Sequence, residues 1–280
     1  MTDIINRRSL MAAGALGVLF AASPTHAEDK PLLMDPMRKS TVKPRHVLCF
    51  LGADNDQSRL MEAAEQLGFK VDHDYSQDEP DPRMQASFEV CRDRVHPGAW
   101  EPSDEDAVLK HKSVFYVVGP PMTQDNAVAC SASALSIVGK MIEAGAVAVK
   151  GESAGVAHGL KRWRQLAAEC GKAAQPGQEA ALASAMSRIC RLAFAKRPLS
   201  SDRYFESVGF HLVGLPEVYV ANSLGGEWDA VHLIDNAADE MAQHGIEPTL
   251  GKRKLSVSYE SSYAEDDFKF NPYGIVHINA

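Results

Sequence analysis

Apolar residues are concentrated between positions 113 and 160, and their spacing predicts a strand, a long helix and a second strand. Residues 114–118 form a continuous β-branched and aromatic run, which is typical of a strand buried on both faces. Residues 126–144 are apolar or small on nearly every side, so we expect this helix to lie deep in the core. Residues 146–149 predict the second strand, and residues 156–170 predict a helix after a glycine-rich turn.

Shorter elements are expected on both sides of this block. Before it, the pattern predicts strands over 46–51, 69–75 and 87–94, a helix from Asn55 or Asp56 to about Leu67, and an irregular stretch over 96–106. After it, the pattern predicts helices over 178–195 and 227–243, a hairpin of strands over 205–213 and 217–221, and strands over 255–260 and 274–278. The outer face of the 156–170 helix carries charged residues, which indicates a solvated surface: Lys161, Arg162, Arg164 and Glu169.

The order of these elements mixes β-α-β crossovers with adjacent strand pairs. This mixture predicts an α+β fold, with a mixed β-sheet and packed helices that include the buried central helix. No composition shift marks a boundary after residue 45, so we expect a single domain over 45–280.

The first 27 residues have the pattern of a twin-arginine signal peptide. Arg7 and Arg8 precede an Ala- and Gly-rich apolar stretch over 12–22, and residues 23–27 resemble a cleavage site. About a dozen apolar residues are too few to cross the roughly 30 Å hydrocarbon core of a membrane. We therefore expect a cleaved Tat-type signal, a polar leader over 28–44, a periplasmic or secreted location, and no stable membrane insertion after cleavage.

The charge of the chain excludes some classes of partner. Its formal net charge is -8, with 37 acidic and 29 basic residues. Binding to nucleic acid or to an anionic membrane surface is driven by clustered Lys and Arg. The composition therefore predicts no nucleic-acid partner, and it leaves an unknown protein or a small anionic ligand as the expected partner.

The cysteines and histidines do not form a recognisable disulfide or metal pattern. The five cysteines are Cys49, Cys91, Cys130, Cys170 and Cys190. Cys170 and Cys190 flank a loop, but in an antiparallel helical hairpin their offset would be roughly 15 Å, too far for a bridge. Asp72-His73-Asp74 has no second ligand group at a diagnostic spacing. We expect no structural disulfide, no metal site and no cofactor.

One local string has a chemical meaning, Gly151-Glu152-Ser153-Ala154-Gly155. A G-x-S-x-G string between a strand and a helix is the pattern of a nucleophile elbow, as in carboxylesterase-like hydrolases. A triad also needs an acid and a histidine later in the chain. The order Ser153, then Asp229 or Asp235, then His244 or His277 is present, although no HGGG-like oxyanion string occurs.

A structural interpretation of the same string is also open. Ser153 is suited to cap the N-terminus of the following helix, while Gly151 permits the sharp turn. A helix N-terminus can hold an anion without any chemistry, so Gly151, Ser153, Ala154 and Gly155 are candidate ligand-binding residues. His158, one helical turn after the serine, is expected as a core or surface histidine or as part of the same site.

Three blocks of the sequence resemble a family of uncharacterised bacterial proteins, the domain-of-unknown-function family 4261. They are AVAVKGESAGVAHGLKRW over 146–163, GFHLVGLPE over 209–217 and FNPYG over 270–274. The resemblance spans roughly residues 113–280. It implies an α+β domain without an established activity, and it supplies no catalytic residues.

Two functions remain open from the sequence. The favoured one is an exported, soluble, non-catalytic protein that binds another protein or a small anionic ligand. The alternative is an esterase-like periplasmic serine hydrolase that uses Ser153, Asp235 and His277.

Overall fold

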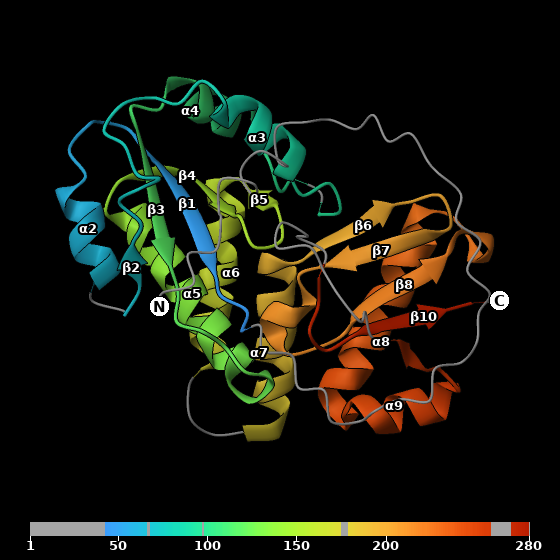
Figure 1. Ribbon diagram of the computed structural model, residues 1–280. Coiled ribbons are helices and arrows are strands. Elements are labelled where there is room, and N and C mark those ends of the chain that lie inside the picture. The colour runs from blue at the N-terminus through green and yellow to red at the C-terminus, as the bar shows by residue number, and fades with distance from the viewer. Residues whose placement is uncertain (1–42, 66–67, 97, 175–178, 259–269, 280) are drawn as a thin grey trace, which may run out of the picture.

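The computed structural model describes residues 43–65, 68–96, 98–174, 179–258 and 270–279 of the chain. The predicted signal peptide and nearly all of the predicted leader lie outside these residues. The fold is α+β, as predicted, but the strands form two five-stranded sheets instead of one (Figure 1). No helix in the described ranges is long and apolar enough to cross a membrane.

The first sheet has the order β2-β3-β1-β4-β5, and each neighbouring pair is antiparallel. Its strands are β1 (Val47–Gly52), β2 (Lys70–Val71), β3 (Ser113–Val118), β4 (Ala146–Gly151) and β5 (Val156–His158). Because β3 and β4 are both antiparallel to β1, they run parallel to each other. Helix α5 (Ala127–Glu143) makes the crossover that this arrangement requires.

The second sheet has the order β6-β7-β8-β10-β9. Its strands are β6 (Lys196–Ser200), β7 (Tyr204–Val208), β8 (Glu217–Ala221), β9 (Val257–Ser258) and β10 (Ile275–Ile278). Strands β8 and β10 are parallel, and α8 (Glu227–His244) and α9 (Ile246–Arg253) lie between them in sequence. The predicted hairpin is present as the antiparallel pair β7 and β8, whereas residues 210–213 form the short 3-10 helix η2 (Phe210–Val213).

A row of helices covers one face of both sheets. The α-helices whose bounds have not yet been given are α2 (Ser58–Glu65), α3 (Met84–Cys91), α4 (Pro102–Lys110), α6 (Leu160–Ala173) and α7 (Glu179–Phe194). Helices α5, α6, α7 and α8 pack against one another in that order (Figure 1). One apolar core runs under the whole row, from Leu48 in β1 to Val276 in β10.

The strand β1 is buried on both faces because two different helical layers cover it. Leu48 and Phe50 point into the core beneath the helix row. Cys49 and Leu51 point to the opposite face, where they pack with residues of α3 and α4. Strand β3 alternates in the same way, which confirms the prediction of a strand without an exposed face.

The predicted central helix is also confirmed as α5. Its buried side includes Ala134, Leu135 and Val138, which are inaccessible to solvent. The opposite side is exposed and carries small residues such as Ser133 and Ser136. Lys140 and Glu143 follow on that side only in the last turn, so most of the helix has apolar or small residues all round.

Two segments before β3 differ from their predictions. The strand expected over 87–94 is instead helix α3, in which Met84, Phe88 and Cys91 are buried at helical spacing while Val90 is 55% exposed. The stretch expected to be irregular contains α4, which begins with the capping residue Glu101 and Pro102. In so short a segment both periodicities fit, and packing against the first sheet decides between them.

The roughly 15 Å offset expected for Cys170 and Cys190 is too large. The two thiols, on α6 and α7, lie in the same apolar core and are close enough for each to shift the pKa of the other, and both are free.

The three sequence blocks of the family resemblance meet in space. The buried carboxyl group of Glu217 accepts hydrogen bonds from the backbone N–H groups of Gly209 (3.0 Å) and Phe210 (2.9 Å) and from the Asn271 side chain (3.0 Å). A Cβ at Gly209, where φ is +106°, would lie 2.6 Å from the Cβ of Ala154. Glycine is therefore required where the first block packs on the second.

A buried histidine at the start of β1 makes stability sensitive to acid. His46 Nε2 lies 2.7 Å from Ser131 Oγ, and the Ser131 hydroxyl donates to the Leu212 carbonyl oxygen (2.5 Å), so the ring donates its Nε2–H to Ser131. Burial is the main cause that lowers the pKa of His46 from 6.5 to about 3, and the nearby His211 acts in the same direction. The unfolded chain therefore binds an extra proton between these pH values, and stability is lost as the pH falls through this range.

We expect His46→Gln to remove this acid sensitivity. Between about pH 6 and pH 4, the free energy of unfolding of the wild type should fall more steeply than that of the variant, by roughly 1.4 kcal/mol per pH unit. Urea unfolding at pH 7, 6, 5 and 4 measures both slopes. Equal slopes would contradict the prediction.

Candidate functional site

The Gly151–Gly155 string forms the turn of a β-hairpin. Strand β4 ends at Gly151, and β5 starts at Val156 and pairs with it antiparallel. Gly155 has a φ of +61°, which this tight turn requires. The helix that the sequence predicts from residue 156 begins only at Leu160, so Ser153 caps no helix and the expected anion site at a helix N-terminus is not formed there.

The hydroxyl group of Ser153 is committed to the backbone of the neighbouring strand. It donates its hydrogen to the carbonyl oxygen of Arg45 (2.8 Å) and accepts the N–H of Val47 (2.9 Å). A serine nucleophile needs a base that takes this same proton. Ser153 instead joins the hairpin turn to the start of β1.

The other members of the proposed triad lie in different surroundings. Asp235, on α8, accepts hydrogen bonds from Arg191 and Arg197. His277, on β10, contacts Ser258 (3.1 Å) and lies against the rings of Tyr204 and Tyr219. The alternative residues are also placed elsewhere: Asp229 caps the N-terminus of α8, and His244 lies in its last turn. The structure therefore does not assemble a triad around Ser153.

Of the candidate ligand-binding residues, His158 lies in a cluster of ionisable groups. Its Nε2 lies 3.1 Å from the Ala193 carbonyl oxygen, and its Nδ1 lies 3.3 Å from Asp93 Oδ2. The indole ring of Trp163 packs edge-on against the imidazole at 4.8 Å. These contacts fix the ring at the end of β5, where it faces the loop that follows α3.

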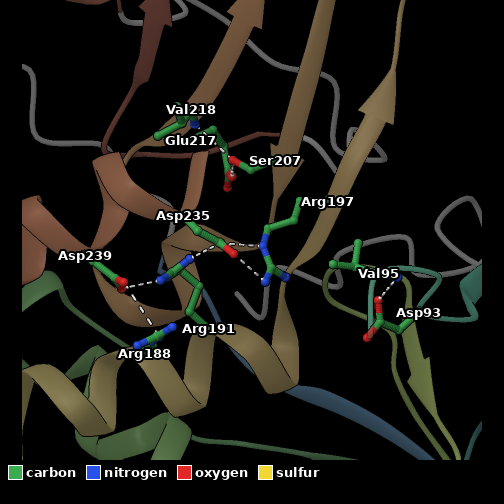
Figure 2. A network of polar contacts seen from close by, with 10 residues as sticks. All are labelled: Asp93, Val95, Arg188, Arg191, Arg197, Ser207, Glu217, Val218, Asp235 and Asp239. Atoms are coloured by element: carbon green, nitrogen blue, oxygen red, sulfur yellow. Dashed lines mark hydrogen bonds and ion pairs between the residues drawn. The ribbon is translucent and has the colours of Figure 1, made fainter. Parts of the chain in front are cut away.

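Asp93 is held next to this histidine by the backbone. Its N–H donates to the Ala157 carbonyl oxygen (2.9 Å), and its Oδ1 accepts the N–H of Val95 (3.0 Å; Figure 2). Burial raises the pKa of the Asp93 carboxyl, but the contact with His158 and the charge of Arg197 outweigh this effect and lower it. We expect this carboxyl group to be ionised at neutral pH.

Arg162 completes the cluster from the first turn of α6. The sequence places it on a solvated face, but only 7% of the residue is exposed. Its buried Nε has no hydrogen-bond partner, and within the described ranges no carboxylate forms an ion pair with its guanidinium. Burial lowers the pKa of Arg162, as does the positive charge of Arg197, while Glu169 and Asp93 act in the opposite direction.

A second arginine network borders the cluster (Figure 2). Arg197 of β6 forms a bidentate pair with Asp235, with distances of 2.6 and 2.9 Å. Arg191 of α7 bridges Asp235 and Asp239. These two arginines have carboxylate partners, which is the ordinary arrangement for buried guanidinium groups. Arg162, by contrast, has no carboxylate in an ion pair with it among the described residues.

We define the Arg162 site as Asp93, His158, Arg162 and Arg197. These residues come from the α3–α4 connection, β5, α6 and β6, so only tertiary structure brings them together. A guanidinium group presents five N–H donors in a planar fork that matches carboxylate and phosphate groups. The site therefore has the chemistry to bind a small anion. Across the described residues, no three His, Cys, Asp or Glu side chains are grouped as metal ligands.

Comparison with known proteins gives no relative for this chain: no family model, no curated protein and no solved structure matches it.

Proposed function

We propose that the protein is an exported, non-catalytic binding protein that holds a small anionic molecule at the Arg162 site. The observation that carries this proposal is the buried Nε of the Arg162 guanidinium, which lacks an acceptor among the described residues. Export rests on the twin-arginine pattern of residues 1–27. Membership of family 4261 is part of the proposal and rests on the three sequence blocks alone.

The energetic argument concerns what happens to a buried charge. A charged group that leaves water without a partner costs several kcal/mol, and proteins normally offset this cost with a carboxylate and hydrogen bonds. The acidic group that influences Arg162 from another element is Asp93, which already contacts His158 and accepts the N–H of Val95. A bound anion would supply the missing acceptors and would strengthen its own hydrogen bonds through the low local dielectric.

The proposed ligand is a small molecule that carries a carboxylate or phosphate group. Both groups accept two parallel hydrogen bonds from a guanidinium group. Lys196 adds positive charge near Asp93, and burial lowers the pKa of this lysine, as does Arg94. Only 7% of Arg162 and 14% of the Asp93 side chain are exposed, so we expect contact with one anionic group rather than with an extended polymer.

The test replaces Arg162 and a matched neighbour. Wild-type protein should gain thermal stability in phosphate or succinate relative to chloride at equal ionic strength, and Arg162→Met should weaken this binding at least about tenfold. Without the anion, Arg162→Met should be more stable than wild type by roughly 1 to 2 kcal/mol, because it removes a buried unpaired charge. Comparing phosphate with succinate distinguishes the two ligand groups.

The control is Arg164→Met, because Arg164 lies on the same helix and is exposed. It should leave both the anion effect and the stability nearly unchanged. If neither anion stabilises the wild type, or if Arg162→Met lowers stability without changing the anion effect, Arg162 has a purely structural role and the proposal is wrong.

A further inference from the structure

We propose that the second sheet carries a binding site for a small aromatic carboxylate, formed by Arg203, Tyr204, Ser223 and Asn279. The site lies at one end of the outer face of this sheet, which we define as the face opposite helix α8 (Figure 1). It shares no residue with the Arg162 site, so this inference goes beyond the proposed function and does not depend on it.

Alternation along the strands places three aromatic rings on the outer face. Val220 of β8 points into the apolar core, so the adjacent Tyr219 points to the outer face. Val276 and His277 alternate in the same way on β10. The ring of Tyr204, on β7, lies 6.1 Å from that of Tyr219 and 5.1 Å from that of His277. These tilted and edge-on contacts hold the three rings together, and we call them the aromatic cluster.

A cavity of about 300 Å³ lies at the Tyr204 end of the aromatic cluster. Tyr204 is paired with Ala221 across the β7–β8 ladder, so the two side chains line the cavity from the same face of the sheet. The small side chain of Ala221 leaves room beside the tyrosine ring. A volume at the lower end of the range for ligand pockets suits one six-membered ring with a few substituents.

Arg203 is placed to bind a carboxylate at this cavity. It lies in the turn between β6 and β7, and its guanidinium carbon is 5.7 Å from the centre of the Tyr204 ring. The attraction between the cation and the ring restrains the guanidinium group beside the cavity. Within the described ranges no carboxylate forms an ion pair with Arg203. Its fork of N–H donors can therefore form two parallel hydrogen bonds with the carboxylate of a ligand.

The charge of the site favours a ligand with one negative group. Of the described residues that line the cavity, Arg203 alone is charged. Burial lowers the pKa of His277, as does the charge of Arg203, while Glu206 acts in the opposite direction. We therefore expect a neutral imidazole in the aromatic cluster at pH 7, and a single positive charge at the cavity.

The rest of the lining points to an aromatic ring that carries a polar substituent. Tyr204 offers a ring against which another aromatic ring packs edge-on or offset. The exposed side chains of Ser223 and Asn279 can both donate and accept hydrogen bonds, so they suit a hydroxyl group on the ligand. An aliphatic acid would keep the contact with Arg203 and lose the ring packing.

The experiment titrates the mature protein with 4-hydroxybenzoate and with cyclohexanecarboxylate by calorimetry at pH 7. We expect the aromatic acid to bind at least about tenfold more tightly than the aliphatic one, because only the first packs a π-system against Tyr204. Arg203→Met should weaken binding of 4-hydroxybenzoate at least about tenfold. Arg164→Met, which removes an exposed arginine from helix α6, is the matched control and should leave the affinity unchanged.

Two tyrosine variants test the role of the ring. Tyr204→Phe keeps the ring and should retain the preference for the aromatic acid. Tyr204→Leu should bind both acids with similar, low affinity. Thermal melting of each variant shows that the fold is intact, and Arg203→Met, at an exposed turn, should melt with the wild type.

The outcomes separate this site from the Arg162 site. The inference is wrong if 4-hydroxybenzoate does not bind, if both acids bind wild type equally, or if Arg203→Met binds as well as wild type. Arg162→Met should leave binding of 4-hydroxybenzoate unchanged. If Arg162→Met abolishes this binding and Arg203→Met does not, the aromatic acid occupies the Arg162 site, and the proposed function stands while this inference fails.

Discussion

Replacement of Glu152 by glutamine is expected to destabilise the folded protein by roughly 3 to 5 kcal/mol, because it leaves a buried ammonium group without its counter-charge. The Lys150 side chain is 1% exposed, and its Nζ lies 2.7 Å from Glu152 Oε1. Ser87 Oγ lies 2.5 Å from the same nitrogen, and the Phe88 ring lies 5.3 Å away. Of these groups, only Glu152 carries a negative charge.

The pair is part of a polar row that crosses the first sheet. Tyr116 of β3, Cys49 of β1 and Lys150 of β4 are in register on neighbouring strands and face α3. The Tyr116 hydroxyl donates to Glu152 Oε1 at 3.1 Å. Burial by itself lowers the pKa of Lys150, but the adjacent Glu152 raises it above its ordinary value.

Replacement of the other partner, Lys150, should destabilise the protein less. Lys150→Met leaves behind Glu152, whose side chain is 16% exposed and keeps the Tyr116 hydroxyl as a donor. We expect a cost of roughly 1 to 2 kcal/mol, because the remaining charge can reach water. The combination Lys150→Met with Glu152→Gln should be more stable than Glu152→Gln alone. Chemical denaturation of the four proteins at pH 7 measures the cycle.

The pH dependence gives an independent check on this assignment. In the wild type, the raised pKa of Lys150 means that its stabilising effect is present at neutral pH and is lost above about pH 10.4, the ordinary lysine pKa. In Glu152→Gln, burial alone should lower that pKa, so stability should rise between about pH 7 and pH 10. Parallel pH profiles for the two proteins would sink the interpretation.

Replacement of Glu217 by leucine should destabilise the second sheet by roughly 4 kcal/mol or more, because it leaves several buried donors without an acceptor. Glu217 is 1% exposed and accepts four hydrogen bonds, of which the shortest, 2.6 Å, comes from Ser207 Oγ. The other donors are the N–H groups of Gly209 and Phe210 and the amide of Asn271. Figure 2 shows Ser207 beside Glu217 and Val218, and its hydroxyl group donates to the Glu217 carboxylate and accepts the N–H of Val218.

The conservative variant distinguishes hydrogen bonding from packing. Glu217→Gln keeps one acceptor oxygen for the three N–H donors, so it should cost about half as much as Glu217→Leu or less. Glu247→Gln, at an exposed position on α9, is the matched control and should change stability by less than about 0.5 kcal/mol. Urea unfolding measures all three. An equal loss for the glutamine and leucine variants would contradict the acceptor role.

Much of the fold is predictable because some segments have only one consistent periodicity. Strand β3, helix α5, strand β4 and helix α8 are long or uniformly apolar, and each is found within a few residues of its expected position. Helix α3 is eight residues long, and Phe88 fits either a strand face or a helix face. Strand β5 has only three residues, so its local sequence cannot outweigh the helical pattern that follows it.

The candidate site was harder to predict because its residues come from segments that are distant from one another in sequence. Arg162 follows Lys161 and precedes Trp163, so by position it looks like one more charged residue on a helix surface. Asp93, in the loop after α3, and Arg197, in β6, influence its charge, and both are distant from it in sequence. His158 was identified as a candidate, but its partner Asp93 comes from a segment that was predicted as a strand.

The sequence by itself determined the α+β class, the double-sided burial of the central strands and the position of the central helix, because hydrophobic periodicity acts within one element. It also singled out the Gly151–Gly155 turn. Tertiary structure decided that this turn closes a hairpin, that Ser153 donates its proton to the Arg45 carbonyl oxygen, and that the Nε of Arg162 is buried without a partner among the described residues. Hydrogen-bond partners and burial depend on which distant segments pack together, and local patterns carry no information about that choice.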